Sequence, residues 1–344
     1  MAKKISLADV AASLGLSKTV VSMVKNGKAD SYGISKETQR RVLERIDEMN
    51  YRPNALAQGF RTGKTHTLGL IVSDISNGFY SRIARKLEDL AWQNGYNMVI
   101  CSTDEQVEKE QKQIEFLLDR QIDGLIISSS QADCNYANKL MDAGVPIVFI
   151  DRTFPGLKSP SVSVNNEEGA RLVALHLMDQ GCTDFLVFAN SPVHMSSMDQ
   201  RIRGFTNTIL EAGFCFPPNR LVVVPFSQVE ETVRNSLNDC WQSGRMPDAI
   251  FGLNNVITAE VMNQLKNRSI SIPEEIAVIS FDDMAFFNLT QPSVSAVGQP
   301  IKQISETAFQ LLIQQMNKHS TGEAVHVQLP VTLIARESSL KKSS

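Results

Sequence analysis

The fold of most of this chain is decided by eight short apolar runs: LGLIVSD (68–74), MVICST (98–103), DGLIISS (123–129), PIVFID (146–151), FLVFAN (185–190), LVVV (221–224), AIFGLN (249–254) and AVISFD (277–282). They alternate with amphipathic stretches long enough to form helices. Continuous apolar strands alternating with helices are typical of parallel sheets covered on both faces. Eight strands exceed one comfortable doubly wound sheet. We therefore expect an α/β body of two doubly wound parallel-sheet subdomains.

Composition excludes several classes of protein. The 344 residues are 42% hydrophobic and 21% charged, which is globular composition for two or three domains. No apolar run approaches the roughly 18 residues that cross a bilayer, and Asp9 interrupts the N-terminus before a signal-peptide core. The cysteines are odd in number and lack a CxxC pair, which indicates reduced thiols and no zinc site: Cys101, Cys134, Cys182, Cys215 and Cys240. We expect a cytoplasmic protein without membrane, metal or cofactor.

The charge of the chain is divided unevenly along its length. Residues 1–65 carry 12 Lys/Arg and 6 Asp/Glu, whereas the remaining residues carry 22 and 31. A basic N-terminal segment on an acidic body indicates that the segment meets a polyanion while the body has another task.

The first 50 residues predict three short helices, each preceded by a serine able to cap it: Ser6, Ser17 and Ser35. Ala11 is small where the first two helices would touch, Gly15 supplies their turn, and Val21 anchors the second helix. The third helix is predicted to have one apolar face: Val42, Leu43, Ile46 and Met49. This spacing predicts a helix-turn-helix, and the alternative is a generic three-helix bundle.

Longer motifs resemble the LacI/GalR family of bacterial transcription regulators. The resemblance begins with ISLADVAASLGLSKTVVSMVKNG (5–27) and SKETQRRVLERIDEMNYRPNALAQGFRTGKTHTLGLIVSDISNGFY (35–80). It continues through DGLIIS, IDR, NNEEGAR, RIRGF, PEEIAVISFDD, QPSVSAVGQP and VTLIARES. It implies a dimeric helix-turn-helix head that binds a palindromic operator in double-stranded DNA. It also implies a periplasmic-binding-protein-like body that binds a small effector between its subdomains.

The resemblance implies that three residues of the second helix read bases: Lys18, Thr19 and Met23. Lys18 is expected to donate to guanine, and Thr19 to contact a thymine methyl or a base edge. Met23 replaces the Arg or His common in the family and cannot donate, so it would read shape or a thymine methyl. The connection 28–33 also looks longer than usual. Expected phosphate contacts, each with a solvated surface role as the alternative, are Ser6, Ser22, Lys25, Asn26 and Tyr51.

Residues 53–61 match the hinge helix of the family, which inserts an apolar side chain into the minor groove. Phe60 replaces the usual leucine and is a suitable wedge for unstacking a base step. Asn54 and Ala57 are expected DNA contacts in the same segment. Gly59 is a poor helix former, by about 1 kcal/mol relative to Ala, so this hinge would fold only on DNA and beside its partner. Packing of Phe60 on the body is the alternative.

Ligands of open α/β sheets bind at the carboxyl ends of the strands. Asp74, Asp104 and Asn190 lie there, and we expect the effector to contact a further set: Asn77, Phe79, Ser128, Asp151, Arg152, Arg201, Phe226, Asn254 and Asp282. Arg201 and Asp282 match effector positions of the family. A donor fork and carboxylates grip hydroxyls or a carboxylate, and an aromatic face stacks on a ring.

Other roles remain open for some of these residues. Asp151 and Asp282 as helix caps, Phe226 in the core and Arg152 in a surface ion pair are the alternatives. If both Arg152 and Arg201 face the cleft, a sugar acid or sugar phosphate becomes an attractive ligand.

The predicted organisation is a helix-turn-helix head at 1–52, a hinge and linker at 53–66, a first subdomain at 67–161 plus 293–320, and a second at 162–292 plus 321–340. The chain then crosses between the subdomains three times. We expect a homodimeric repressor controlled by a sugar or sugar derivative, and no tail-mediated tetramer because no apolar heptads follow Ser338. Catalysis is not expected, since no GxGxxG, Walker loop, GxSxG or metal-spaced histidines occur. A ligand-binding module of periplasmic type is the rival hypothesis.

Overall fold

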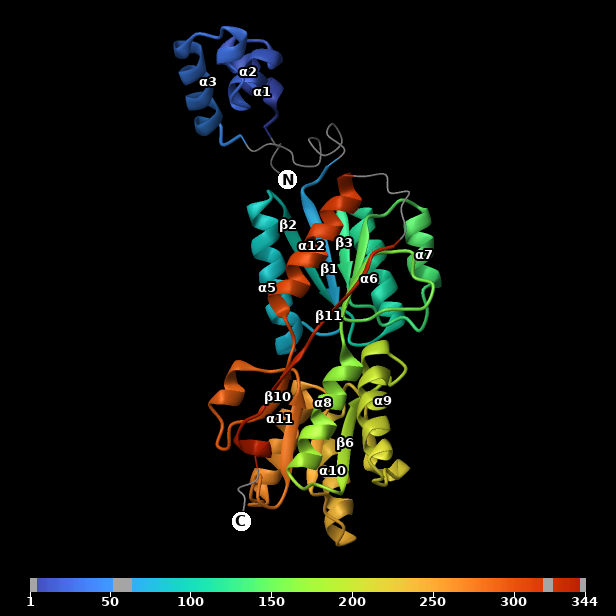
Figure 1. Ribbon diagram of the computed structural model, residues 1–344. Helices are drawn as coiled ribbons and strands as arrows, with labels where there is room; N and C mark the ends of the chain where they lie inside the picture. Colours follow the sequence, from blue (N-terminus) through green and yellow to red (C-terminus); the bar gives the residue numbers. More distant parts are fainter. Residues whose placement is uncertain (1–4, 52–63, 318–323, 341–344) are drawn as a thin grey trace. The chain divides into compact units, whose positions relative to one another are not determined.

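The computed structural model describes residues 5–51, 64–317 and 324–340. The chain forms two compact units, Met1–Thr65 and His66–Ser344. The first unit is the head with its linker, and the second is the body (Figure 1).

The head contains α1 (Leu7–Leu14), α2 (Lys18–Lys25), a 3-10 turn η1 (Asp30–Tyr32) and α3 (Lys36–Glu48). The three predicted serine caps are confirmed, because each hydroxyl accepts from a backbone N–H of the first helical turn. Gly15 ends α1 with φ +67°, and Ala11 and Val21 are buried. The axes of α1 and α2 differ by 110°. This geometry is a helix-turn-helix, as predicted.

Leu43 of α3 and the connection between α2 and α3 differ from the sequence prediction or add to it. Leu43 was predicted on the buried face of α3 but is 49% exposed. The face that packs runs along Val42, Ile46 and Met49, and Leu43 is turned about 100° away from it. The long connection after α2 is folded around buried Ala29, and an exposed ion pair joins Asp30 to Lys36 at 2.8 Å.

In the part of the body that the structure describes, the strands form two six-stranded sheets with the orders β11-β5-β4-β3-β1-β2 and β12-β10-β9-β8-β6-β7. The first comprises β1 (Thr67–Val72), β2 (Asn97–Ser102), β3 (Gly124–Ile127), β4 (Ile147–Ile150), β5 (Ser161–Val164) and β11 (His326–Leu329). The second comprises β6 (Phe185–Asn190), β7 (Leu221–Val224), β8 (Ala249–Gly252), β9 (Ala277–Phe281), β10 (Ser295–Gly298) and β12 (Thr332–Ile334). Among the described strands, all pairings are parallel except β10 with β12.

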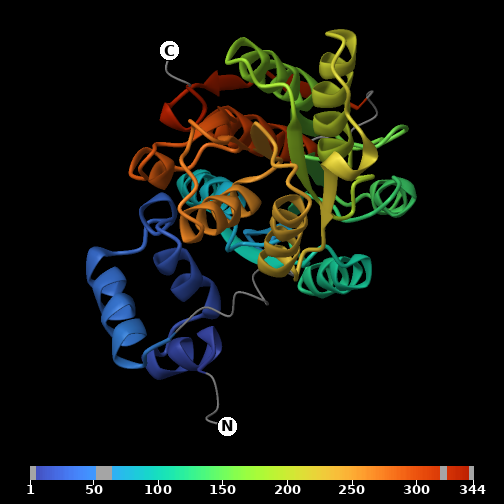
Figure 2. The same cartoon turned by 90° about the horizontal axis from the view of Figure 1, so that it is seen from below.

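Helices cover both faces of each sheet. The first sheet packs against α5 (Gly78–Gln93) and α12 (Ile301–Asn317) on one face, and α6 (Val107–Asp119) and α7 (Asn135–Asp142) on the other. The second packs against α8 (Asn166–Asp179) and α9 (Ser196–Glu211), with α10 (Val229–Gln242) and α11 (Asn255–Asn267) opposite (Figure 2). Short 3-10 turns complete this subdomain: η2 (Pro218–Arg220), η3 (Ala285–Asn288) and η4 (Glu337–Ser339).

The chain crosses between the sheets three times, after β5, after β10 and between β11 and β12 (Figure 1). These crossings differ from the predicted boundaries at 161/162, 292/293 and 320/321. The sheets place β5 (Ser161–Val164) and β11 (His326–Leu329) in the first subdomain and β10 (Ser295–Gly298) in the second. β5 and β11 are short and mix polar with apolar residues, so the apolar pattern does not reveal which sheet they join.

No single helix among the described residues is long and apolar enough to cross a membrane, and only α1 and α2 together, as one bent pair, reach that length and composition.

His176 of α8 fastens the C-terminal η4 to the second subdomain. Its Nε2 lies 2.7 Å from the hydroxyl of Ser339, and burial lowers the pKa of the imidazole below its usual value of 6.5. The unfolded chain therefore binds this proton more readily, so folding stability should fall as pH decreases below about 6.5.

Urea unfolding of His176→Gln between pH 5 and 7.5 should show less of this acid loss than the wild type. His194→Gln, at an exposed position, is the control. An identical pH dependence in wild type and His176→Gln would contradict the assignment.

Candidate functional site

A pocket of about 180 Å³ lies between the two subdomains of the body. It is lined by Ser73, Asp74, Asn77, Phe79, Tyr80, Glu105, Asp151, Arg152, Asn190, Ser197, Met198, Arg201, Phe226, Asn254 and Asp282, together with Val229 and Val256. Eight of the nine predicted effector residues are among them. The exception, Ser128, is fully buried behind the pocket wall, where its hydroxyl is 3.0 Å from the Tyr80 hydroxyl. The carboxyl ends of the strands thus bring the predicted residues together.

Asp151 and Asp282 occupy matching places, one after the last residue of β4 and the other after β9. Their φ angles are +67° and +74°, in the left-handed region, and both side chains are at least 93% buried. No described helix uses either as its N-cap, so the capping alternative does not apply. Such backbone conformations cluster at binding sites, where the surrounding structure maintains them.

Tyr80 fixes the Asp151 carboxylate from α5. Its hydroxyl donates to Asp151 Oδ2 at 2.9 Å. Burial, followed by the nearby Asp151 charge, raises the pKa of Tyr80, so the phenol remains a neutral donor. Burial likewise raises the pKa of Asp282, and Gln299 Nε2 donates to its Oδ1 at 2.5 Å.

Arg201 of α9 is held rigidly in the wall of the pocket. Its Nε donates to Asn166 Oδ1 at 2.8 Å and its Nη1 to the Leu253 carbonyl at 2.7 Å. The guanidinium carbon lies 3.6 Å from the centre of the Phe281 ring. Burial lowers the pKa of Arg201, and the charges of Asp282 and Asp151 oppose that shift. A buried fork held at fixed geometry is suited to orient a ligand.

Arg152 forms a buried ion pair. The alternative considered from the sequence was an ion pair at the surface. Its Nη1 and Nη2 donate to the two carboxylate oxygens of Glu105 at 2.7 and 2.6 Å. Both side chains are buried, at 8% and 12% exposure. Two atoms of the pocket-lining residues, Arg152 Nε and Asn190 Oδ1, are buried without a hydrogen-bond partner. One donor and one acceptor are therefore left for a ligand.

The remaining predicted residues serve both the pocket and the fold. Phe226 is half-buried on the pocket wall rather than in the core. Asn254 caps α11 by accepting from the Ile257 N–H at 2.8 Å. Asn77 caps α5, and its Oδ1 also accepts from Asn255 Nδ2 of the other subdomain at 2.9 Å. The pocket walls are thus joined directly across the cleft.

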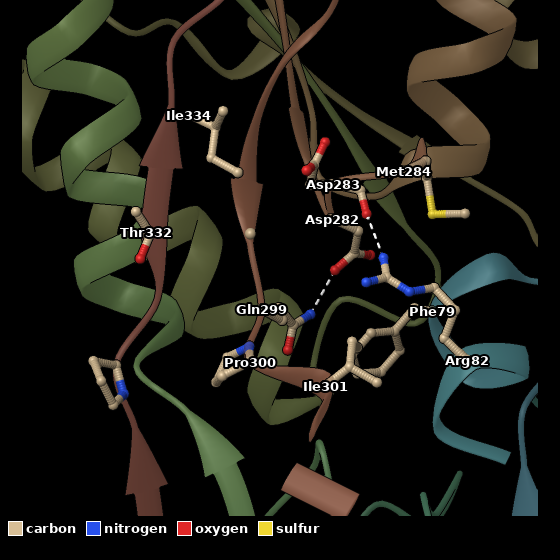
Figure 3. A pocket seen from close by; sticks show the side chains of 12 residues that line it. Phe79, Arg82, Asp282, Asp283, Met284, Gln299, Pro300, Ile301, Thr332 and Ile334 are labelled. Atoms are coloured by element: carbon tan, nitrogen blue, oxygen red, sulfur yellow. Dashed lines mark hydrogen bonds between the residues drawn. The ribbon is translucent and has the colours of Figure 1, made fainter. Parts of the chain in front are cut away.

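A second cavity of about 380 Å³ lies beside the crossing segments and shares Phe79 and Asp282 with the first (Figure 3). Figure 3 shows Arg82 of α5 reaching toward Asp283, whose carbonyl accepts from Arg82 Nη1 at 2.8 Å. Asp282 and Gln299 meet in the same view. The segment between β9 and η3 therefore borders both cavities.

Sequence reasoning missed Tyr80 and Glu105. Tyr80 follows the predicted Phe79 directly on α5, and that adjacency was an available signal. Glu105 lies beyond β2 in a turn where both Asp104 and Glu105 have positive φ, which the sequence pattern does not reveal. Among the described residues, no group of three or more His, Cys, Asp or Glu is placed to hold a metal ion.

The predicted base-reading residues lie together on α2. Lys18 and Thr19 are the exposed first two residues of that helix, and Met23 is half-buried. Among the expected phosphate contacts, the Ser6 hydroxyl is occupied by Asp9 at 2.7 Å, Asn26 Nδ2 donates to Ser22 at 3.2 Å, and Lys25 Nζ is 5.6 Å from the centre of the Tyr51 ring. Asn54, Ala57 and Phe60 fall outside the described residues.

A helix-turn-helix joined to a two-subdomain body with a ligand cleft defines a sequence-specific DNA-binding transcription regulator. Residues 6–54 match the model for bacterial regulatory proteins of the lacI family, and residues 174–339 match a periplasmic binding protein-like domain. A ribose operon repressor of Halalkalibacterium halodurans is 30% identical over 334 residues, which cover 96% of each chain. The chain belongs to the LacI family.

Solved structures agree with this fold. A lac repressor dimer bound to operator and the anti-inducer ONPF superposes with a TM-score of 0.84 at 23% identity, covering 98% of this chain and 100% of that one. A periplasmic binding protein/LacI transcriptional regulator of Alkaliphilus metalliredigens, complexed with D-xylulofuranose, is 30% identical with a TM-score of 0.69, covering 80% of this chain and 100% of that one. The predicted α/β body with a helical head is confirmed.

Proposed function

We propose that this protein is a homodimeric, cytoplasmic repressor that binds a palindromic operator and responds to a sugar or sugar derivative in the cleft. It carries out no catalysis. The observation that carries the proposal is the pairing, in one chain, of exposed Lys18 and Thr19 on a recognition helix with a buried cleft containing an unpartnered donor and acceptor. A sugar hydroxyl both donates and accepts, so it satisfies such a pair.

The size of the cleft supports a small ligand. Its volume of about 180 Å³ is below the roughly 300–1,000 Å³ of pockets that hold drug-sized molecules. Phe79 and Phe226 supply apolar surface beside the carboxylates, as a sugar ring requires. The relatives named for ribose regulation and complexed with D-xylulofuranose support the same class of ligand.

The contacts that join the subdomains suggest how the effector acts. Asn255 bonds Asn77, the Thr153 N–H donates to Ser196 Oγ at 2.9 Å, and Arg82 bonds the Asp283 carbonyl. A ligand between the subdomains would favour one relative orientation of the two and thereby shift the population of DNA-binding dimers. Two heads related by two-fold symmetry would occupy half-sites about one helical turn apart.

Selection of bound sequences from random duplex DNA near physiological salt tests the DNA-binding part of the proposal. The full chain should enrich a palindrome, and residues 66–344 should enrich none. Weak, salt-sensitive and unselective binding by the full chain would count against an operator, because phosphate contacts alone behave in that way. No binding by either form would favour the ligand-binding-module hypothesis.

Removing the predicted base contact is expected to weaken specific binding selectively. Lys18→Ala should cost about 1–3 kcal/mol on the selected operator and relax its preference at one position, since Lys18 stands exposed at the start of α2. The matched control is Lys36→Ala, which removes the same charge from α3, where Lys36 is paired with Asp30. Titrations on operator and on scrambled duplex give the comparison. Equal losses on both duplexes for Lys18→Ala would refute base reading.

A further inference from the structure

The charges that line the effector pocket do not balance. Four carboxyl groups line it, from Asp74, Glu105, Asp151 and Asp282, against two guanidinium groups, from Arg152 and Arg201. A fifth carboxyl, Glu110, is buried behind Glu105 and Arg152, where Ser129 and the Ser130 N–H hydrogen-bond to it. Burial raises the pKa of Glu110. The presence of two arginines in the cleft therefore does not make it a site for anions.

Glu105 neutralises the positive charge of Arg152. The contact is a two-pronged pair in which each terminal guanidinium nitrogen donates to a different oxygen of Glu105, and Nη1 also donates to the Ser129 carbonyl at 2.9 Å. Only Nε remains unpartnered, and it lies 3.6 Å from Asp151 Oδ2. A carboxylate or phosphate that approached Nε would meet Asp151 and Glu105 at close range.

The turn that carries Glu105 is built to hold this pair. Asp104 and Glu105 have φ angles of +51° and +59°, which residues other than glycine seldom adopt. Lys109 pairs with Asp104 at 2.5 Å, and the Ser130 hydroxyl donates to Glu105 Oε2 at 3.3 Å. Such strained backbone angles cost free energy and cluster at functional sites. Their presence in the turn beside the pocket therefore indicates that the turn has a function there.

Arg201 is held in place by neutral oxygens. Its Nε and Nη1 donate to Asn166 and to the Leu253 carbonyl, and the nearby Asp282 and Asp151 oppose the lowering of its pKa by burial. An anion that approached Arg152 would be desolvated beside Glu105 and Asp151, and burial of such a charge is costly. Neutral hydroxyls lose far less on desolvation and can bond the unpartnered Arg152 Nε and Asn190 Oδ1.

We infer that the cleft selects neutral polyhydroxyl ligands over sugar acids and sugar phosphates, and that Glu105 is the residue that sets this preference. The inference rests on the proposed function for the location of the effector. Glu105 acts as a charge filter: it neutralises Arg152, leaves one directional donor for a hydroxyl, and repels anions. The sequence made an anionic effector attractive if both arginines faced the cleft. We infer a neutral effector instead.

The test compares wild type, Glu105→Gln and the control Glu108→Gln, which removes a carboxylate from the exposed first turn of α6. The probes are acetate and inorganic phosphate, and pairs of D-ribose with D-ribonate, D-xylose with D-xylonate and D-galactose with D-galacturonate. Calorimetric titration and thermal melting report binding. Because glutamine has the shape of glutamate and still accepts one hydrogen bond, the variant is expected to fold.

Wild type and Glu108→Gln should bind the neutral member of a pair and neither acetate nor phosphate. Glu105→Gln frees the charge of Arg152, so it should gain affinity for acetate, phosphate and the acid members by roughly tenfold or more. Adding Arg152→Gln to Glu105→Gln should remove this gain, which would assign it to that guanidinium.

Three results would overturn the inference: anion binding by wild type as tight as that of the neutral partner, no gain in Glu105→Gln, or a gain that persists without Arg152. All three leave the proposed regulator intact if the operator selection succeeds. Failure of that selection would remove the proposed function and not the anion response, because acetate and phosphate report the charge of the cleft whatever the natural effector is.

Discussion

Replacing Arg201 with methionine is expected to weaken effector control strongly while operator binding persists. Arg201 is 3% exposed, and its guanidinium joins α9, α8 and the end of β8 in the pocket wall. Methionine keeps the length of the stem but loses every donor, and truncating a buried, hydrogen-bonded charge costs about 2–5 kcal/mol. Since about 1.4 kcal/mol corresponds to tenfold, the affinity for the effector should fall by roughly thirtyfold or more.

The control for this prediction is on the same helix. Arg203 is exposed and forms a surface ion pair with Asp199 at 3.0 Å, so Arg203→Met should change effector affinity little. Titration of the sugar that stabilises the wild type, followed by operator release on adding that sugar, gives both readouts. An Arg201→Met protein that still releases DNA at the wild-type concentration would show that Arg201 lies outside the effector contacts.

Gly204→Ala is expected to destabilise the body strongly, although it adds only a single methyl group. A Cβ at this position would stand 2.2 Å from the carbonyl oxygen of Glu167 and 2.8 Å from its carbon, where α9 crosses α8. Both atoms belong to backbone, so no side-chain rotation relieves the overlap and the helices must separate. We expect a loss of about 3 kcal/mol or more, at the upper end of overpacking effects.

Asn207→Ala provides the matched comparison, because the same residue is introduced on the exposed side of α9. Alanine favours the helix there, so that variant should be unchanged or more stable by a few tenths of a kcal/mol. Urea unfolding with a fitted slope separates a change of stability from a change of compactness. An unchanged midpoint for Gly204→Ala would mean that α8 and α9 do not approach each other closely.

The predictable part of this fold follows from burial. All eight apolar runs correspond to strands. Six of them are inner strands, which must be apolar because helices cover both faces of the sheet, whereas β2 and β7 are edge strands whose apolar residues stay partly exposed. The four strands that the pattern missed are β5, β10, β11 and β12, which are short. Two of them, β11 and β12, form sheet edges with partly exposed residues, as in HVQL of β11, so they carry no continuous apolar signal. Leu43 shows the complementary error, an apolar residue that nothing covers.

The sequence predicts the site residues that directly follow strands, but it does not predict which charged side chains form ion pairs there. Asp151 and Asp282 follow apolar runs directly, so their positions at the sheet edge could be predicted from spacing. The partner of Arg152 could not, because Glu105 is 47 residues away and reaches it through two left-handed residues. The sequence therefore places Arg152 in the cleft but does not show that Glu105 neutralises its charge. In our inference, this neutralisation determines which ligands the cleft binds.

The three crossings between the subdomains also govern when the body can fold during synthesis. The edge strands β11 and β12 are the last of the described strands to leave the ribosome, and each completes a different sheet. The head, with a core formed within residues 5–51, is available long before then. A nascent chain therefore presents a finished DNA-binding head on an unfinished sensor, and both halves of the sensor are completed within the same few residues. Translation that stops early would yield a head without regulation.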